Sequence, residues 1–131
     1  MIDLVAATPA GAPLRGLDNG QVAAALASGV PVFDIRRPYE WEGTGIIPGS
    51  RLLTFFDETG GFDLEGWMAA FTAVVGRDDV FVLVCRLGRR TDVLGRYLGG
   101  ACGYAGAAHL EHGITWWAAA GYPLVAPPTG V

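Results

Sequence analysis

The sequence runs Phe81-Val-Leu-Val-Cys-Arg-Leu-Gly-Arg-Arg-Thr91 just past its midpoint, and this stretch joins an apolar run to a turn that is rich in arginine. Residues 80–84 are continuously apolar, which is typical of a strand that is buried on both faces of a parallel sheet. From Thr91 onward the apolar residues recur at helical spacing, so we expect a helix to begin there. The five residues between Cys85 and Thr91 then turn the chain from strand to helix, and Gly88 permits that turn.

Cys85 is the candidate reactive group of this turn. A loop between a strand and a helix can aim several backbone N–H groups inward as an anion-binding nest, with the positive end of the helix behind them. Such surroundings favour the thiolate, which is the nucleophilic form of a cysteine. The alternative is a buried structural thiol, against which the charges of Arg86, Arg89 and Arg90 argue.

The composition is that of one globular domain, residues 1–131, whose core we expect to cover about residues 14–124 between a flexible lead-in and a flexible tail. The net charge of −4 offers no basic footprint for nucleic acid or for an anionic membrane, so neither is expected as a partner. No apolar run reaches the length of a membrane span, and the first residues lack the features of a signal peptide. Two cysteines suit a reducing compartment, so we expect a cytoplasmic protein.

The rest of the chain alternates between predicted strands and helices, which predicts an α/β fold. Asp18 or Asn19 is expected to cap one helix, and Asp63 to cap a second helix that runs to residue 75 and ends at Gly76. Residues 57–61 form a predicted turn, and residues 99–103 a flexible connection. The expected strands cover residues 14–17, 30–35, 52–56, 80–84 and 104–110.

Three motifs resemble those of rhodanese-like sulfurtransferases. The stretch from Cys85 to Thr91 is similar to the active-site loop of that family, Cys-Arg-x-Gly-x-Arg-Ser/Thr. A second stretch resembles the family's Asp-x-Arg, Glu-aromatic and Gly-His-Ile-x-Gly-Ala elements, although Ile46 replaces the histidine and Ser50 replaces the alanine. Its matching residues are Asp34, Arg36, Glu40, Trp41, Gly45, Ile47 and Gly49.

The third motif resembles the family's closing pattern, Leu-x-Gly-Gly-Ile-x-x-Trp-x-x-x-Gly-x-Pro. Trp117, Gly121 and Pro123 match it, while His112 replaces the first glycine of the usual pair. The three motifs occur in the order of the family and cover about residues 30–124. The resemblance implies a mainly parallel sheet of about five strands with helices on both faces.

The resemblance also implies a chemistry and a set of site residues. Cys85 would attack a small anionic sulfur donor such as thiosulfate, carry the sulfur as a persulfide, and pass it to cyanide, a thiol or a protein acceptor. No metal or organic cofactor is implied. Asp34, Arg36 and Glu40 would support the site, with Asp34 and Arg36 interpreted as an ion pair that holds a loop. The residues expected to bind the substrate are Arg86, Leu87, Gly88, Arg89, Arg90 and Thr91.

Two other functions remain as alternatives. A cysteine phosphatase or an arsenate reductase also places a cysteine in an anion-binding loop, but such loops commonly run Cys-x-x-x-x-x-Arg, and Arg90 comes one residue too early for that spacing. A non-catalytic rhodanese-like carrier or regulatory module usually lacks the cysteine.

The second cysteine and the two histidines have simpler interpretations. Cys102 has no charged neighbour, so we interpret it as structural rather than as a resolving thiol for Cys85. His109 and His112 lie three residues apart without other metal ligands around them, so no metal site is expected.

Overall fold

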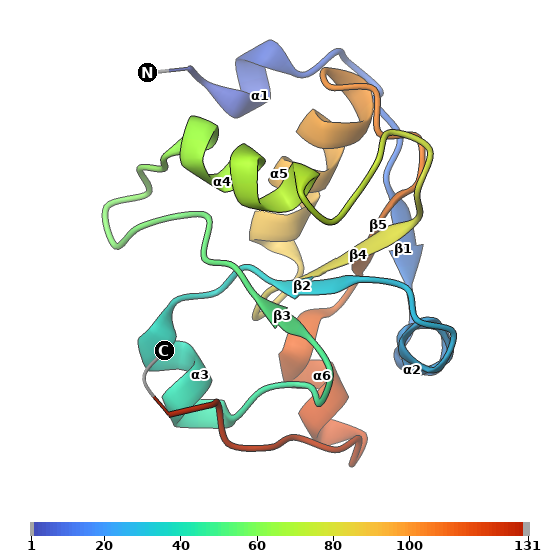
Figure 1. Ribbon diagram of the computed structural model, residues 1–131, viewed down its shortest axis with the longest axis vertical. Helices are drawn as coiled ribbons and strands as arrows, with labels where there is room; N and C mark the ends of the chain where they lie inside the picture. Colours follow the sequence, from blue (N-terminus) through green and yellow to red (C-terminus); the bar gives the residue numbers. More distant parts are fainter. Residues whose placement is uncertain (1, 130–131) are drawn as a thin grey trace.

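The computed structural model of the chain describes residues 2–129, and its centre is a five-stranded parallel sheet with the strand order β1-β5-β4-β2-β3 (Figure 1). Every neighbouring pair of strands in the sheet is parallel. This confirms the predicted fold class. The strands are β1 (Arg15–Leu17), β2 (Val32–Asp34), β3 (Arg51–Leu52), β4 (Phe81–Val84) and β5 (Ala107–Leu110).

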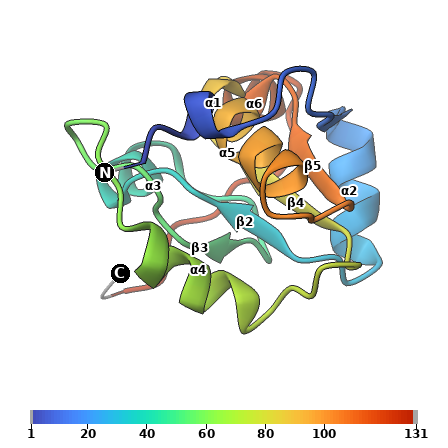
Figure 2. The same ribbon diagram turned by 90° about the horizontal axis from the view of Figure 1, so that it is seen from above.

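Helices cover both faces of the sheet, as predicted. α1, α4 and α5 pack on one face, and Figure 2 looks down on that side of the molecule. α2 and α6 pack on the other face. The helices are α1 (Leu4–Ala7), α2 (Asn19–Ala27), α3 (Pro38–Thr44), α4 (Leu64–Thr72), α5 (Arg89–Gly100) and α6 (Gly113–Ala119).

β4 is the central strand, and all four of its residues are buried. Phe81 and Leu83 belong to the core on the α4 and α5 side, whereas Val82 and Val84 belong to the core on the α2 and α6 side. Because side chains alternate along a strand, Cys85 continues the first series and points toward α5. The apolar run of residues 81–84 therefore has the predicted cause, since both of its faces are covered, whereas Val80 is exposed before the strand begins.

α5 begins two residues earlier than expected, at Arg89 instead of Thr91. Gly88 lies in the left-handed region, with a φ of 87°, so the chain enters the helix directly after it. The turn between Cys85 and the helix consequently has three residues rather than five. α5 also continues through the glycines at 99 and 100, which were expected to lie in a flexible connection. A side chain at Gly100 would collide with Ala12, so this end of the helix packs closely against the lead-in.

Other elements differ from expectation in their extent. α4 ends at Thr72 because the amides of Val74 and Val75 both bond to the carbonyl of Phe71 and tighten the chain into turns, so the expected end at Gly76 was wrong. β5 begins at Ala107 instead of residue 104. The Asp18 cap of α2 is present, since its carboxylate accepts a hydrogen bond from the Gln21 amide.

Three helices were not expected at all. α1 forms within the lead-in, where Asp3 caps it and Leu4 is buried against the core. α3 begins at Pro38, a residue that suits the first turn of a helix, and α6 follows β5.

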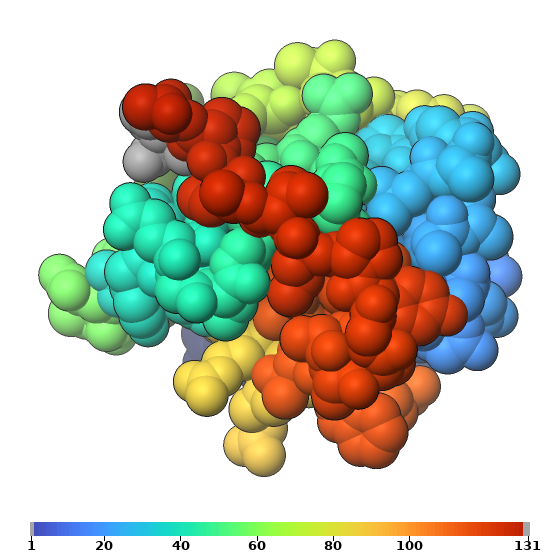
Figure 3. Space-filling model, turned by 90° about the horizontal axis from the view of Figure 1, so that it is seen from below, coloured from blue at the N-terminus to red at the C-terminus, as the bar shows by residue number. Residues whose placement is uncertain are grey.

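The C-terminal segment crosses the surface beside α3 (Figure 3), where Val125 and Ile46 form an antiparallel bridge. The last two residues of the expected tail, 130–131, lie outside the described residues. No helix in residues 2–129 is long and apolar enough to cross a membrane.

Candidate active site

Cys85 follows the last residue of β4, at the carboxyl end of the central strand, where ligand sites of parallel α/β sheets lie. Its side chain is buried beneath the turn, with only 1% of the residue exposed. The Gly88 amide donates a hydrogen bond to Cys85 Sγ over 3.2 Å, and Thr91 Oγ1 lies 3.4 Å from the same sulfur. Within residues 2–129, one amide of the expected nest therefore bonds to the sulfur.

The N-terminus of α5 adds a further electrostatic contribution beside this sulfur. The first amides of a helix have no partner within the helix, and they carry the positive end of its dipole. Arg89, Arg90 and Thr91 are the first three residues of α5, and Thr91 contacts the sulfur directly. The Gly88 amide and the positive end of α5 thus both lie beside the sulfur of Cys85.

The turn between β5 and α6 fixes the backbone of this loop from the opposite side. The amide of Ile114 donates to Cys85 O over 2.9 Å, and the amide of Thr115 donates to Arg86 O over 3.2 Å. A side chain on Gly88 would meet the carbonyl oxygen of Glu111, and one on Gly113 would meet the backbone of Arg86. The loop and the closing motif of the sequence are therefore packed backbone to backbone.

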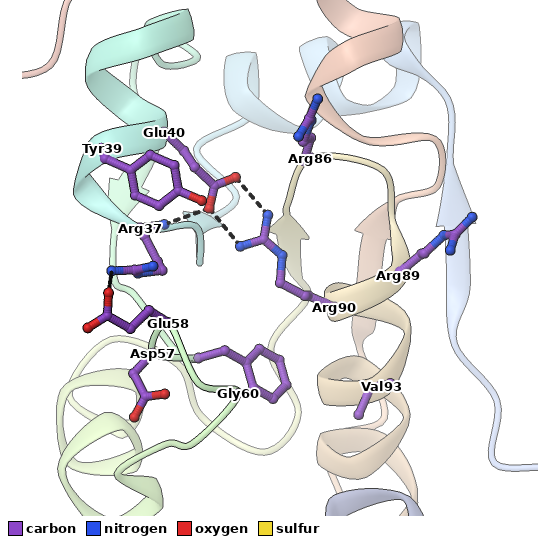
Figure 4. Close-up of a pocket in the computed structure, with 11 residues that line it drawn as sticks. Arg37, Tyr39, Glu40, Asp57, Glu58, Gly60, Arg86, Arg89, Arg90 and Val93 are labelled. Carbon is purple, nitrogen blue, oxygen red and sulfur yellow. Dashed lines mark hydrogen bonds and ion pairs between the residues drawn. The ribbon is translucent and has the colours of Figure 1, made fainter.

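Arg90 is paired with Glu40 rather than with the sulfur. Its guanidinium forms two parallel hydrogen bonds of 2.8 Å to the two carboxylate oxygens of Glu40, which join α5 to α3 (Figure 4). The hydrogen bond to Glu40 raises the pKa of Arg90, and burial opposes this rise. Burial also raises the pKa of Glu40, but the bonds from Arg90 and from the Arg37 amide outweigh it, so the net shift is downward.

A cavity of about 550 Å³ lies beside the loop, between α3, α5 and the segment before α4 (Figure 4). Arg86 and Arg89 are exposed at this cavity and form no ion pair among residues 2–129, whereas Arg37 pairs with Glu58 over 3.5 Å. Its lining therefore has mixed charge, with two unpaired guanidinium groups. The lining residues are Arg37, Tyr39, Glu40, Phe56, Asp57, Glu58, Gly60, Arg86, Arg89, Arg90 and Val93.

Asp34 and Arg36 form the expected ion pair. Arg36 is fully buried, and its Nη2 lies 2.9 Å from Asp34 Oδ2. The same guanidinium donates to Thr44 Oγ1 and to the carbonyl of Gly45, so it joins the end of β2 to the end of α3. Neither residue lines the cavity.

The remaining loop residue, Leu87, lies on a different side of the loop. Its side chain is exposed, and it lines a second cavity of about 340 Å³ together with Gly88 and Arg89. The six predicted substrate-binding residues are therefore divided between two cavities and the buried space around Cys85.

His109 is a site residue that the sequence interpretation missed. It lies on β5, and its Nδ1 is 2.7 Å from Thr91 Oγ1, which in turn contacts Cys85. Burial lowers the pKa of His109, which favours the neutral imidazole. In the sequence, His109 was considered only together with His112. Its actual neighbour is Thr91, which lies on α5, the helix that follows the adjacent strand β4. Among residues 2–129, no cluster of three potential metal ligands is present.

Cys102 lies at the other end of α5 from the candidate site. The 12 residues of α5 separate it from the loop, which corresponds to roughly 18 Å of helix. Both cysteines are free thiols. Burial and the nearby Cys102 raise the pKa of Tyr97. Cys102 is partly buried and packs against the same core cluster that contains Cys85, but at the far end of α5.

Comparison with solved structures gives several similar folds. A rhodanese-related protein from Thermoplasma volcanium is 21% identical, covers 86% of this chain and 99% of its own, and has a TM-score of 0.63. The polysulfide-sulfur transferase homodimer from Wolinella succinogenes is 19% identical, covers 97% of this chain and 87% of its own, and has a TM-score of 0.69. Identities this low establish a shared fold alone.

A third structure, a possible tyrosine phosphatase of unknown function from Rhodopseudomonas palustris, is 27% identical. The match covers 93% of this chain and 90% of that one, with a TM-score of 0.64. A search of curated proteins found no match.

The family model for the rhodanese-like domain matches residues 18–120, which include β2, β4 and the whole loop from Cys85 to Thr91. The chain therefore belongs to the rhodanese-like domain family.

Proposed function

We propose that this protein is a sulfurtransferase that carries a sulfane sulfur as a persulfide on Cys85. The observation that carries the proposal is the position of Cys85 Sγ, which accepts the Gly88 amide at the start of α5. This arrangement stabilises a thiolate and, after transfer, a persulfide anion. Membership of the rhodanese-like family supports sulfur transfer in general.

The chemistry proceeds in two displacements. The Cys85 thiolate attacks the outer sulfur of thiosulfate, a new S–S bond forms, and the bond within thiosulfate breaks so that sulfite leaves with the electron pair. A thiophilic acceptor such as cyanide, a thiol or a protein cysteine then attacks the outer sulfur of the persulfide. The Cys85 thiolate leaves with its electron pair, and the resting state returns.

The loop residues have distinct roles in this scheme. The Gly88 amide and the first turn of α5 hold the negative sulfur, while Arg86 and Arg89 attract an anionic donor to the cavity. Arg90 and Glu40 keep α3 and α5 in register beside the loop. Because Cys85 is buried, the donor must present a small terminal atom, and this requirement favours a sulfane sulfur over a bulkier group.

Partners and location follow from the same chemistry. A small anionic sulfur donor and a thiol or protein acceptor are the proposed partners, and the net charge of −4 argues against nucleic acid and anionic membranes. A thiol that must remain reduced between turnovers supports a cytoplasmic location.

A cysteine phosphatase is the second candidate, favoured by the possible tyrosine phosphatase among the similar structures. A guanidinium that binds phosphate commonly does so through two parallel hydrogen bonds. In Arg90, the loop arginine nearest to the phosphatase position, both ends of the guanidinium are occupied by Glu40, while Arg86 and Arg89 remain unpaired at the cavity. We therefore favour sulfur transfer. A non-catalytic carrier would take up sulfur on Cys85 without turning over.

Mass spectrometry after thiosulfate treatment tests the proposal. The protein should gain the mass of one sulfur atom and lose it again on addition of cyanide. Cys85→Ser should abolish both the gain and thiosulfate:cyanide transfer, whereas Cys102→Ser, the matched control at the far end of α5, should retain most of both. Equal losses in the two variants would contradict the assignment of Cys85 as the sulfur carrier.

A further inference from the structure

We propose that Thr91 and His109 form a proton relay for Cys85, which leads from the thiol to the second cavity on the β5 side of the loop. The inference rests on the proposed role of Cys85 as a nucleophile. Three side chains from β4, α5 and β5 form a continuous chain, with 3.4 Å between Cys85 Sγ and Thr91 Oγ1 and 2.7 Å between Thr91 Oγ1 and His109 Nδ1.

The hydrogen count of Thr91 couples the other two groups. Its hydroxyl has one proton, so it can donate either to His109 Nδ1 or to Cys85 Sγ, but not to both. For the thiol state we assign Cys85 S–H as the donor to Thr91, and Thr91 as the donor to an unprotonated Nδ1. In the thiolate state, Thr91 must donate to the sulfur, so His109 must carry a proton on Nδ1. Ionisation of Cys85 therefore requires a change at His109.

The proton transfer balances without any other reactant. The thiol proton passes to Thr91 Oγ1 while the hydroxyl proton passes to His109 Nδ1, and the products are a thiolate and an imidazolium. His109 can then release the proton on Nε2 to water. No hydrogen bond to Nε2 is present within residues 2–129, and the ring lines the second cavity, so an exit is available.

The second cavity is separate from the one beside the arginines. It has a volume of about 340 Å³, and Arg89 is the single lining residue that the two cavities share within the described chain. β1 places Gly16 beside His109, and the carboxylate of Glu111 lies over that glycine and lines the same cavity. A proton can leave through this cavity while an anionic donor occupies the other.

Burial and neighbouring charges act on the pKa of His109 in opposite directions. Asp92 on α5 and Glu111 after β5 raise the pKa of His109, whereas burial, which is the largest effect, together with Arg96 and His112 lowers it. The imidazole is consequently neutral at rest, yet it has two carboxylates nearby that stabilise a transient positive charge.

The first test uses alkylation of Cys85, because the rate of reaction with iodoacetamide reports the thiolate fraction and does not depend on sulfur transfer. All variants carry Cys102→Ser so that Cys85 alone reacts. His109→Asn should lower the rate near about pH 6 by tenfold or more and should remove one ionisation from the pH profile. His112→Asn, at an exposed histidine three residues on, removes only a neighbouring charge, so it should keep the ionisation that His109→Asn removes. Superimposable profiles for the unaltered protein and His109→Asn would overturn the relay.

Two changes at Thr91 separate the hydroxyl from the packing. Thr91→Ser keeps the hydroxyl and should keep the pH profile, whereas Thr91→Val keeps the shape and should lose the same ionisation as His109→Asn. Equal profiles for these two variants would contradict the relay.

The second test uses the unaltered protein and does not depend on a folded variant. The ionisation of Cys85 is monitored by the absorbance of the thiolate. As the pH rises through that ionisation, nitrogen NMR of His109 should show that Nδ1 gains a proton. This is opposite to the ordinary titration of a histidine. In Cys85→Ser the inverse step should vanish. An Nδ1 that stays unprotonated while Cys85 ionises would refute the relay, and a protein that fails to form a persulfide would refute the sulfurtransferase proposal alone.

Discussion

Replacing Gly88 by alanine should destabilise the protein and open the loop around Cys85. Gly88 has a φ of 87°, and a side chain there would collide with the carbonyl oxygen of Glu111, which is backbone and cannot rotate away. The left-handed conformation costs a non-glycine residue about 1–2 kcal/mol. The collision adds an overpacking cost of about 1–3 kcal/mol. We therefore expect Gly88→Ala to lose about 2–5 kcal/mol of unfolding free energy.

Gly29→Ala is the matched control for this prediction. Gly29 has a φ of 80°, but nothing lies within 4 Å of the position where a side chain would start. It should therefore lose only the conformational cost of about 1–2 kcal/mol. Urea denaturation measures both free energies, and the difference between the variants isolates the contact with Glu111.

The functional effect of Gly88→Ala should accompany the loss of stability. Relief of the collision requires the loop to move away from the β5–α6 turn, and this carries the Gly88 amide away from Cys85 Sγ. Alkylation of Cys85 in the folded protein should therefore slow at neutral pH, while Gly29→Ala should react at the original rate. Free energies of unfolding that agree within about 0.5 kcal/mol between the two variants would refute the argument from close packing.

Arg90→Ala should lower the turnover of sulfur transfer, per folded molecule, more than Arg36→Ala does, and the opposite order would contradict this division of roles. Arg36→Ala should instead cost about 3–5 kcal/mol of unfolding free energy, because it leaves the Asp34 charge buried without a partner. The lowered pKa of Glu40 means that its contribution to stability is present above the unfolded value of 4.5 and is lost as the pH falls through the lower folded value, so Glu40→Gln should flatten the acid limb of a urea-denaturation series. An unchanged acid limb would count against the Glu40–Arg90 pair. The unaltered protein should hydrolyse aryl phosphates no faster than Cys85→Ser, and Cys85-dependent phosphate release would instead support the phosphatase.

Much of the fold follows from local signals in the sequence. The apolar run at 80–84 predicts the central strand because both of its faces need apolar cover, and the Asp18 cap predicts the start of α2. The helices α1, α3 and α6 were missed because each has seven residues or fewer, too short for periodicity to indicate a helix. The start of α5 was misplaced because the sequence does not indicate that Gly88 adopts a left-handed conformation.

For the candidate site too, some features follow from the sequence and others only from the tertiary structure. The sequence by itself determined that Cys85 follows a buried strand and precedes a helix, since both signals lie within a few residues of it. Only the tertiary structure decided that Arg90 binds Glu40, 50 residues away, and that Thr91 contacts His109 on the neighbouring strand. These partners depend on the strand order β5-β4-β2. Because β4 lies between β5 and β2, the helix that follows it, α5, can contact His109 on β5 on one side and Glu40 on α3, after β2, on the other. Strand order results from the burial of the whole sheet between its helices, and no short stretch of sequence contains that information.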